Sequence, residues 1–218
     1  SALAEILPRV GHPNALTGVS WGETLKALGE ELQGVESLRC DVVPVIGAMG
    51  TIETGVYPNS IARSFAERLG GSSYLVNAPA VLDSEETAER LVRDSTFEQV
   101  HDLWQRIDCA ILGASSLDEE TSVYRGGIFS SDELESLRRA GAVAATNFLF
   151  LNREGTVQDH PLSGRIVCLP ENHMRRIPNV IVAAGGPGKS TAMAATLRSG
   201  LAHILITDAT TAAELVDA

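Results

Sequence analysis

The stretch VIVAAGGPGKSTAMAATLRSGLAHILITD, residues 180–208, decides the fold of this 218-residue chain. It starts with a run of β-branched residues, passes through a glycine-rich turn at residues 185–188, and continues in a segment rich in Ala, Met and Leu. A second apolar run at residues 204–206 ends in Thr-Asp. Short apolar runs bounded by glycine are typical of buried parallel strands, and the middle residues favour a helix. The stretch therefore predicts a strand, a glycine turn, a helix and a second strand.

This glycine turn is a candidate anion site. Glycines let a ligand approach the backbone closely, and the first turn of the following helix offers unpaired N–H groups. Lys189 adds a positive charge, and Lys26 is the only other lysine in the chain. A phosphate group is the ligand that we expect at such a site.

Two other interpretations of the turn remain open. One is a Walker A loop, but the segment AAGGPGKS at residues 183–190 lacks the first glycine of that motif. In addition, too few residues follow Asp208 to supply the remaining strands of a P-loop domain. The other interpretation is a tight turn without a ligand.

A second candidate anion site lies near the start of the chain. Residues 15–25 predict a short strand that breaks at Gly22 into a helix over residues 24–32. Ser20 and Thr24 would present hydroxyl groups at the start of this helix, beside its free N–H groups. The alternative is an ordinary helix cap with Trp21 packed in the core.

The rest of the chain predicts further strands and helices. Strands are expected at residues 41–46, 74–76, 108–112, 142–151 and 165–169. Helices are expected at residues 2–7, 60–69, 85–93, 97–106, 131–140 and 171–176. Asn59 should cap the second of these helices, and Pro44 hints at a bulge or an edge strand. Residues 8–14 read as a loop, and residues 117–130 as a loop that could lie over a site.

Small and polar residues recur where the strands end. They occur at residues 20–22, 47–50, 113–116, 185–188 and 207–208. In open α/β sheets, ligands bind outside the carboxyl ends of the strands, where the strand order reverses. Small and polar residues at five strand ends predict a single binding cleft. No G-x-S-x-G motif, Cys/His pair in a motif or interpretable acidic pair accompanies them, so the sequence supports a binding site better than an active site.

Composition excludes several other classes of protein. The formal net charge of −11 and the pI near 4.9 argue against binding of nucleic acid by this chain alone. Cys40, Cys109 and Cys168 each lie beside an apolar run and read as reduced core thiols of a cytosolic protein. The five histidines lack metal-ligand spacing, so we expect no metal and no cofactor. No apolar run is long enough for a membrane span, and no signal peptide opens the chain.

Several motifs in order resemble the effector-binding domain of SorC/DeoR-type bacterial sugar-responsive transcriptional regulators. They are GVSWGETL at 18–25, NSIARSFA at 59–66, ILGAS at 111–115, AGGPGK at 184–189 and ITDATTAAELV at 206–216. The resemblance covers nearly the whole chain. It implies an α/β fold with a Rossmann-like, mostly parallel sheet and helices on both faces, related to ribose-5-phosphate isomerases and CoA transferases. It also implies one effector domain over residues 1–218, without the family's N-terminal helix-turn-helix module.

The resemblance also implies a set of ligand-binding residues. By position, they are Gly18, Ser20, Gly22, Thr24, Gly47, Gly50, Gly113, Ser115, Gly186 and Lys189. The chain departs from the family pattern at Asn147, where Asp is expected. Some relatives form a Schiff base between a lysine and an aldehyde sugar. With Lys189 assigned to the ligand anion, we do not expect that chemistry here.

Two classes of function follow from the sequence. In the first, the domain is a cytoplasmic, non-catalytic sensor that binds a phosphorylated sugar, forms a homo-oligomer (a dimer or tetramer) and acts on DNA only through the missing module. In the second, it is an isomerase or phosphotransferase acting on sugar phosphates. Turnover of substrate distinguishes the two.

Overall fold

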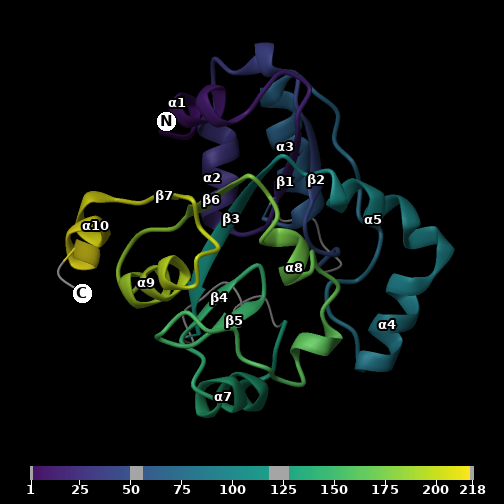
Figure 1. Ribbon diagram of the computed structural model, residues 1–218, viewed down its shortest axis with the longest axis vertical. Helices are drawn as coiled ribbons and strands as arrows, with labels where there is room; N and C mark the ends of the chain where they lie inside the picture. The colour runs from purple at the N-terminus through teal and green to yellow at the C-terminus, as the bar shows by residue number, and fades with distance from the viewer. Residues whose placement is uncertain (1, 50–55, 118–127, 217–218) are drawn as a thin grey trace.

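The computed structural model describes residues 2–49, 56–117 and 128–216 (Figure 1). The helices are α1 (Ala2–Val10), α2 (Glu23–Glu31), α3 (Pro58–Leu69), α4 (Glu85–Arg93), α5 (Glu98–Gln105), α7 (Ser131–Arg139), α8 (Glu171–Met174), α9 (Ser190–Arg198) and α10 (Ala209–Val216). The strands are β1 (Leu16–Val19), β2 (Asp41–Pro44), β3 (Cys109–Ser116), β4 (Ala144–Thr146), β5 (Leu149–Leu151), β6 (Asn179–Ala183) and β7 (Ile204–Ile206). Short 3-10 helices span Glu36–Leu38, Ser95–Phe97 and Ser163–Arg165. The predicted α/β class is confirmed.

The strands β2, β1, β3, β6 and β7 pair side by side in this order, and each of these pairs is parallel. The chain passes from β1 to β2 on one side and then returns to β3 on the other side of β1. The strand order therefore reverses between β1 and β3. The last three residues of β3 pair with β4 in antiparallel fashion, and β4 pairs with β5. β2 is the edge strand of this row, as Pro44 predicts.

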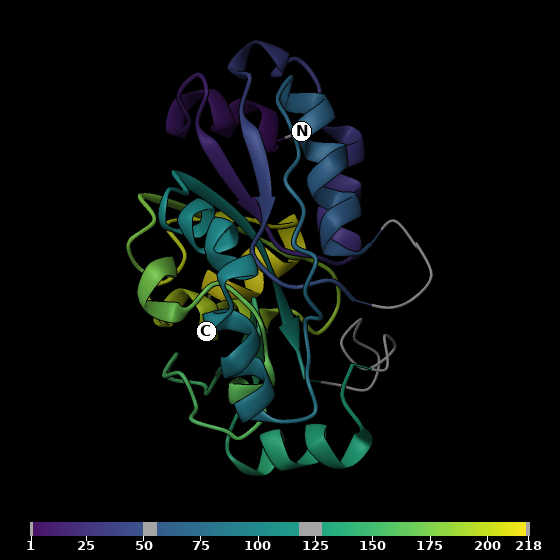
Figure 2. The same cartoon turned by 90° about the vertical axis from the view of Figure 1, so that its right-hand side faces the viewer.

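Apolar side chains alternate between the two faces of the parallel strands, because successive side chains of a strand point in opposite directions. Val19, Val42, Ile111 and Ile181 pack with α1, α2 and α3 in one core cluster. Leu16, Val43, Leu112 and Val182 pack with α5, α8 and α9 in another cluster. Figure 2 shows α3 and α5 on different sides of the strands. The core thus lies on both faces of the sheet and leaves the strand ends to the loops.

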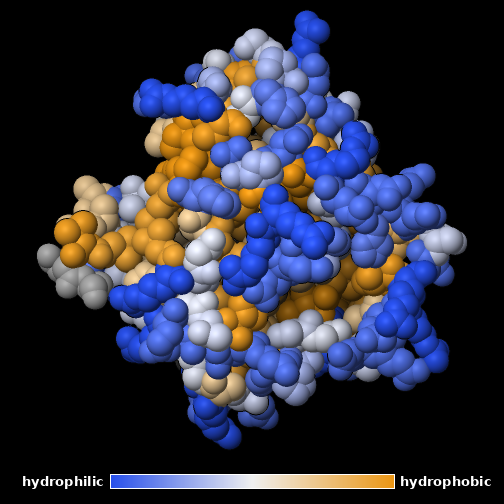
Figure 3. All heavy atoms as spheres, viewed as in Figure 1, coloured by the Kyte–Doolittle hydropathy of each residue, from blue (hydrophilic) through white to orange (hydrophobic). Residues whose placement is uncertain are grey.

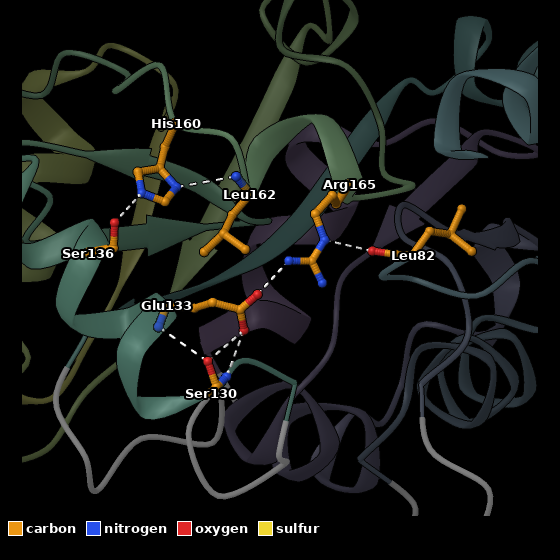
Figure 4. A network of polar contacts seen from close by, with 7 residues as sticks. All are labelled: Leu82, Ser130, Glu133, Ser136, His160, Leu162 and Arg165. Atoms are coloured by element: carbon orange, nitrogen blue, oxygen red, sulfur yellow. Dashed lines mark hydrogen bonds and ion pairs between the residues drawn. The ribbon is translucent and has the colours of Figure 1, made fainter. Parts of the chain in front are cut away.

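A polar network attaches α7 to the segment that precedes α8 (Figure 4). The Ser130 hydroxyl accepts the Glu133 N–H at 3.2 Å, and the Glu133 carboxylate accepts the Ser130 N–H at 2.8 Å, which forms a capping box. The same carboxylate pairs with the guanidinium of Arg165, which also donates to the Leu82 carbonyl at 2.7 Å. His160 contacts Ser136 at 3.1 Å. The capping box of α7 therefore also carries a tertiary contact, through the pair of Glu133 with Arg165.

Several predicted helix boundaries differ from the structure. α1 runs through Pro8 to Val10, because Leu3 and Leu7 are both buried and the N–H of Gly11 bonds to the carbonyl of Leu7 at 2.8 Å. Asn59 does not cap α3, because the helix starts one residue earlier at Pro58, which suits the first helical turn. The Asn59 side chain instead exchanges hydrogen bonds with the backbone of Val76.

Some predicted strands also differ. Residues 74–76 form no strand. The isolated bridge between Val42 and Ser73 lies just before them, and Tyr74 and Leu75 are exposed, so no core face is available to extend the pairing. Residues 165–169 make two isolated antiparallel bridges, which connect Val81 with Ile166 and Ile46 with Cys168. Residues 142–151 form two antiparallel strands instead of one. β3 continues through residues 113–116, because its end finds a partner in β4. The predicted loop at 117–130 lies mostly outside the described residues.

Candidate functional site

The carboxyl ends of the parallel strands lie along one edge of the sheet. Val19 at the end of β1 lies opposite Pro44 of β2 and Ile111 of β3. Farther along, Ala183 at the end of β6 pairs with Gly113 of β3 and with Ile206 of β7. The segments that follow these residues therefore lie at the same edge, as the sequence predicts. The structure brings together the loops after β1 and β6, with Gly113 between them.

A buried hydrogen-bonded junction connects β1, β2 and the β4–β5 hairpin. The Ser20 hydroxyl donates to Oδ1 of Asn147 at 3.1 Å, and Nδ2 of Asn147 donates to the Val45 carbonyl at 3.3 Å. Ser20 and Asn147 are 2% and 4% exposed, so these polar groups depend on one another rather than on water. The junction fixes the end of β1 and gives the predicted site residue Ser20 a defined orientation.

The hairpin turn adds an aromatic contact at the same place. Asn147 and Phe148 adopt φ values of 47° and 60°, as in the type I′ turns that suit the twist of a two-residue hairpin. Phe148 stacks on Trp21 with ring centroids 5.6 Å apart and an interplanar angle of 9°. The sequence predicted one strand over residues 142–151 and did not identify Phe148 as part of the site. Positive φ values at these two residues are the signal that distinguishes the hairpin.

Two predicted site glycines lie where the protein itself fills the space. A Cβ on Gly18, inside β1, would lie 2.6 Å from Cγ1 of Val45 and 3.0 Å from Cδ1 of Ile107. A Cβ on Gly47 would lie 2.7 Å from the carbonyl oxygen of Ala78. Close packing therefore accounts for both glycines, whereas their contact with a ligand stays a prediction. Gly50 lies outside the described residues.

Gly22 lies directly before α2 and Thr24 lies in its first turn, just after the junction. Gly22 precedes the helix with a φ of 110°, which strongly favours glycine, and its N–H donates to the Val56 carbonyl at 3.0 Å. Thr24 is exposed in the first turn of the helix, next to Glu23. The first turn thus presents a hydroxyl group and helix N–H groups toward solvent, as an anion site needs, although Glu23 adds a negative charge.

Gly113 differs from the packing glycines. Among the described residues, a Cβ built on it would meet only the carbonyl oxygen of Trp21 within 4 Å, at the ordinary contact distance of 3.7 Å. Gly113 lies at the reversal of strand order, between the loop after β1 and the loop after β6. Ser115, two residues along β3, donates its hydroxyl to the Ser116 carbonyl at 3.1 Å. Of these two predicted site residues, Gly113 has open space beside it.

The glycine turn after β6 is held by Asp208. The N–H of Gly186, which has a φ of 98°, donates to Oδ2 of Asp208 at 2.7 Å. A Cβ on Gly185 would lie 2.5 Å from the same oxygen. Asp208 also accepts the backbone N–H and the hydroxyl of Thr211 at 2.9 and 2.8 Å, so it caps α10. A phosphate at the Gly186 N–H would have to replace this carboxylate.

Lys189 follows the glycine turn, immediately before α9. Its N–H donates to the Gly186 carbonyl at 3.3 Å, its carbonyl accepts the N–H of Met193, and its side chain is half-buried. Lys26 lies in the body of α2, one turn beyond Gly22. The structure therefore places one lysine beside the turn and the other on the helix that follows β1.

The hydrogen bonds of Asp208 lead to a prediction about pH. Those from the backbone and side chain of Thr211 and from the N–H of Gly186 lower the pKa of Asp208 to about 2. Because this pKa lies below the ordinary value of about 3.9, the contribution to stability is complete above pH 4 and is lost as the pH falls toward 2. We expect Asp208→Asn to melt at a lower temperature than the native chain at pH 6. The difference should shrink between pH 4 and 2 in thermal denaturation curves, and a constant difference would contradict this role.

Other kinds of site find no support in the part of the chain that the structure describes. Within these residues no three His, Cys, Asp or Glu side chains are grouped so that they could hold a metal ion. Nor is any helix of the described ranges long and apolar enough to span a membrane. Cys40 and Cys109 are buried free thiols, and burial raises the pKa of Cys109 to about 12, which makes it a poor nucleophile.

The fold and this strand-end arrangement define an α/β domain with a candidate ligand site at the carboxyl ends of its parallel strands. Residues 1–217 match the family model Sugar-bind, described as "Putative sugar-binding domain", and the chain belongs to this family. One relative is the deoxyribonucleoside regulator of Bacillus subtilis (strain 168), which is 22% identical over 98% of this chain and 68% of its own length. Another is the transcriptional regulator LsrR of Enterobacter sp. (strain 638), which is 28% identical over 96% of this chain and 64% of its own length. This chain thus spans about two thirds of the length of these relatives.

Solved structures agree with this assignment. The full-length sorbitol operon regulator SorC from Klebsiella pneumoniae superposes with a TM-score of 0.88 at 25% identity, over 98% of this chain and 70% of that one. A domain of a possible sugar-binding transcriptional regulator from Arthrobacter aurescens TC1 superposes with a TM-score of 0.87 at 26% identity, over 100% and 84%. The resemblance to sugar-responsive regulators is therefore confirmed, and the domain is of the type that senses effectors for such regulators.

Proposed function

We propose that this chain, residues 1–218, is the effector-binding domain of a cytoplasmic bacterial transcriptional regulator and that it binds a phosphorylated sugar. The sugar lies at the carboxyl ends of β1, β3 and β6. Its binding changes the association of subunits in a homo-oligomer, a dimer or tetramer, and so controls a helix-turn-helix module that contacts DNA. The fold is then a Rossmann-like one, related to ribose-5-phosphate isomerases and CoA transferases.

The observation that carries the proposal is the reversal of strand order between β1 and β3. Ligands of open α/β sheets bind at such points, outside the carboxyl ends of the strands. Here the point is bordered by the Ser20–Asn147 junction, by the open side of Gly113 and by the glycine turn before Lys189. Hydroxyl groups, helix N–H groups and one ammonium group are the donors that a sugar phosphate requires.

Asn147 has a neutral amide side chain, and its hydrogen-bonding groups affect which sugar the site selects. Ser20 and Val45 engage the oxygen and one N–H of this amide, and we place its second N–H toward the sugar. An amide can both donate to and accept from a sugar hydroxyl, whereas a carboxylate only accepts. A non-catalytic role agrees with the relatives, which are named as regulators. The alternative is an isomerase or phosphotransferase, which would turn its substrate over.

Thermal denaturation with a panel of sugar phosphates tests the proposal. Binding to the native state alone stabilises by about 2.7 kcal/mol at 100 times Kd. At roughly 2 to 4 °C per kcal/mol for a domain of this size, the cognate ligand should raise Tm by about 5 to 10 °C. The unphosphorylated sugars and inorganic phosphate serve as controls and should give smaller shifts. Magnesium-dependent turnover of ATP, or conversion of the sugar phosphate, would contradict the sensor function.

A further inference from the structure

A cavity of about 150 Å³ opens at the end of the sheet opposite the strand-end site. Its lining residues are Trp104, Gln105, Ile107, His173, Arg176 and Ile177. Ile107 precedes β3 by two residues, and Ile177 precedes β6 by two residues, so the cavity lies at the amino ends of these paired strands. It is therefore separate from the site proposed for the sugar phosphate.

The innermost lining residues of the cavity are apolar, whereas most of its accessible lining is polar. Trp104, Ile107 and Ile177 are 2%, 5% and 4% exposed and belong to the core cluster on this face of the sheet. The indole N–H of Trp104 already donates to the Pro44 carbonyl at 2.8 Å, so the ring presents carbon atoms to the cavity. A cavity of about 150 Å³ admits only a small molecule.

Three polar side chains complete the lining and have unused hydrogen-bonding groups. Nδ1 of His173 is buried and has no hydrogen-bond partner among the described residues. The side chains of Gln105 and Arg176 make no hydrogen bond or ion pair within the same part of the chain. Buried polar nitrogens are normally satisfied, and one that is not lowers stability. An imidazole N–H, an amide and a guanidinium group can all donate to one acceptor.

The charge around the cavity favours an anion. Arg106, Arg175 and Arg176 lie at the ends of α5 and α8, in a chain whose formal net charge is −11. Arg175 is neutralised by Glu171, with Nε 2.7 Å from the carboxylate, which leaves the other two positive charges uncompensated by ion pairs among the described residues. Figure 3 shows strongly hydrophilic side chains over α8, beside those over α5.

We propose that this cavity binds a small organic carboxylate, of about four carbons. The guanidinium fork of Arg176 matches the planar carboxylate, and the Nδ1–H of His173 and the amide of Gln105 donate to its oxygens. The short apolar chain of the ligand packs on Trp104, Ile107 and Ile177. An inorganic anion would leave this apolar wall uncovered, and a neutral amide of the same shape would lack the charge that Arg176 pairs with.

The two tryptophans of the chain allow a direct test, because Trp21 borders the strand-end site and Trp104 lines the cavity. The 218-residue chain, labelled with ¹⁵N, is titrated with sodium butyrate, and the indole N–H signals are assigned with Trp21→Phe. We expect a saturable shift of the Trp104 signal and no shift of the Trp21 signal. Butyramide and sodium phosphate at equal ionic strength should not produce it. No saturable shift with butyrate, or an equal shift with either control, would overturn the proposal.

Three variants distinguish a loss of butyrate binding from a loss of structure. Arg176→Ala removes a charge-assisted contact, so the butyrate affinity should fall about tenfold or more. Arg68→Ala removes the same charge from α3, on the other face of the sheet, and should bind within about twofold of the native chain. His173→Leu removes an unsatisfied buried nitrogen, so it should melt no lower than the native chain while losing butyrate. Equal losses in the two arginine variants, or unchanged affinity in His173→Leu, would overturn the assignment.

Discussion

Replacing Gly113 with valine is expected to abolish binding of the sugar phosphate while leaving the fold intact. The backbone at Gly113 has no positive φ, and within the part of the chain that the structure describes a Cβ there meets only the Trp21 carbonyl oxygen, at 3.7 Å. A β-branched residue also suits a strand. The new methyl groups would occupy the space between the loops after β1 and β6, where we place the ligand. The ligand-induced rise in Tm of about 5 to 10 °C should disappear.

The free protein provides the control for this variant. Gly113→Val should melt within a few degrees of the native chain without ligand, and Gly113→Ala, which adds less volume, should weaken binding less. Gly18 and Gly47 are unsuitable for the same test, because a side chain there would collide with Val45 or with the Ala78 backbone. A correctly folded Gly113→Val protein with an unchanged Kd would place the ligand elsewhere.

The second large effect is expected at Lys189. Its ammonium group lies beside the glycine turn, and its loss removes a charge-assisted contact with the phosphate worth about 1.5 to 3 kcal/mol. Lys189→Ala should therefore bind the sugar phosphate about ten- to a hundredfold more weakly, measured by calorimetry. The change should be smaller for the unphosphorylated sugar, which lacks the anion.

Lys26→Ala is the matched control, because it removes the other lysine of the chain and the same charge. Lys26 is on α2, and its loss should leave affinity unchanged within about twofold. If Lys189→Ala folds normally and binds as tightly as the native chain while Lys26→Ala does not, the phosphate belongs at the first turn of α2 instead.

Much of the parallel sheet could be predicted from the sequence, because short apolar runs bounded by glycine specify buried strands directly. β1, β6 and β7 were found in this way, and α4 and α5 were found as well. The hairpin of β4 and β5 was not, since an apolar run reads the same whether or not it turns at Asn147. The extended residues 74–76 and 165–169 resemble strands locally, but whether such segments pair depends on distant partners.

The site was predicted less completely, for a physical reason. Glycine at a strand end signals either close packing or ligand access, and only the surrounding atoms distinguish the two. Gly18 and Gly47 proved to be closely packed, while Gly113 faces open space. The contacts of Asn147 with Ser20 and of Asp208 with Gly186 span 127 and 22 residues. No local pattern reveals such pairs, although Asp208 was visible as the polar residue after a strand.

The measurement that tests the central claim most directly is a titration of the ¹⁵N-labelled chain with the sugar phosphate that raises its Tm. Trp21 stacks on Phe148 beside the reversal of strand order, whereas Trp104 lies at the opposite end of the sheet. Binding at the carboxyl ends of the strands predicts a saturable shift of the Trp21 indole signal, with Trp104 unmoved. A shift of the Trp104 signal alone would contradict the placement of the effector site.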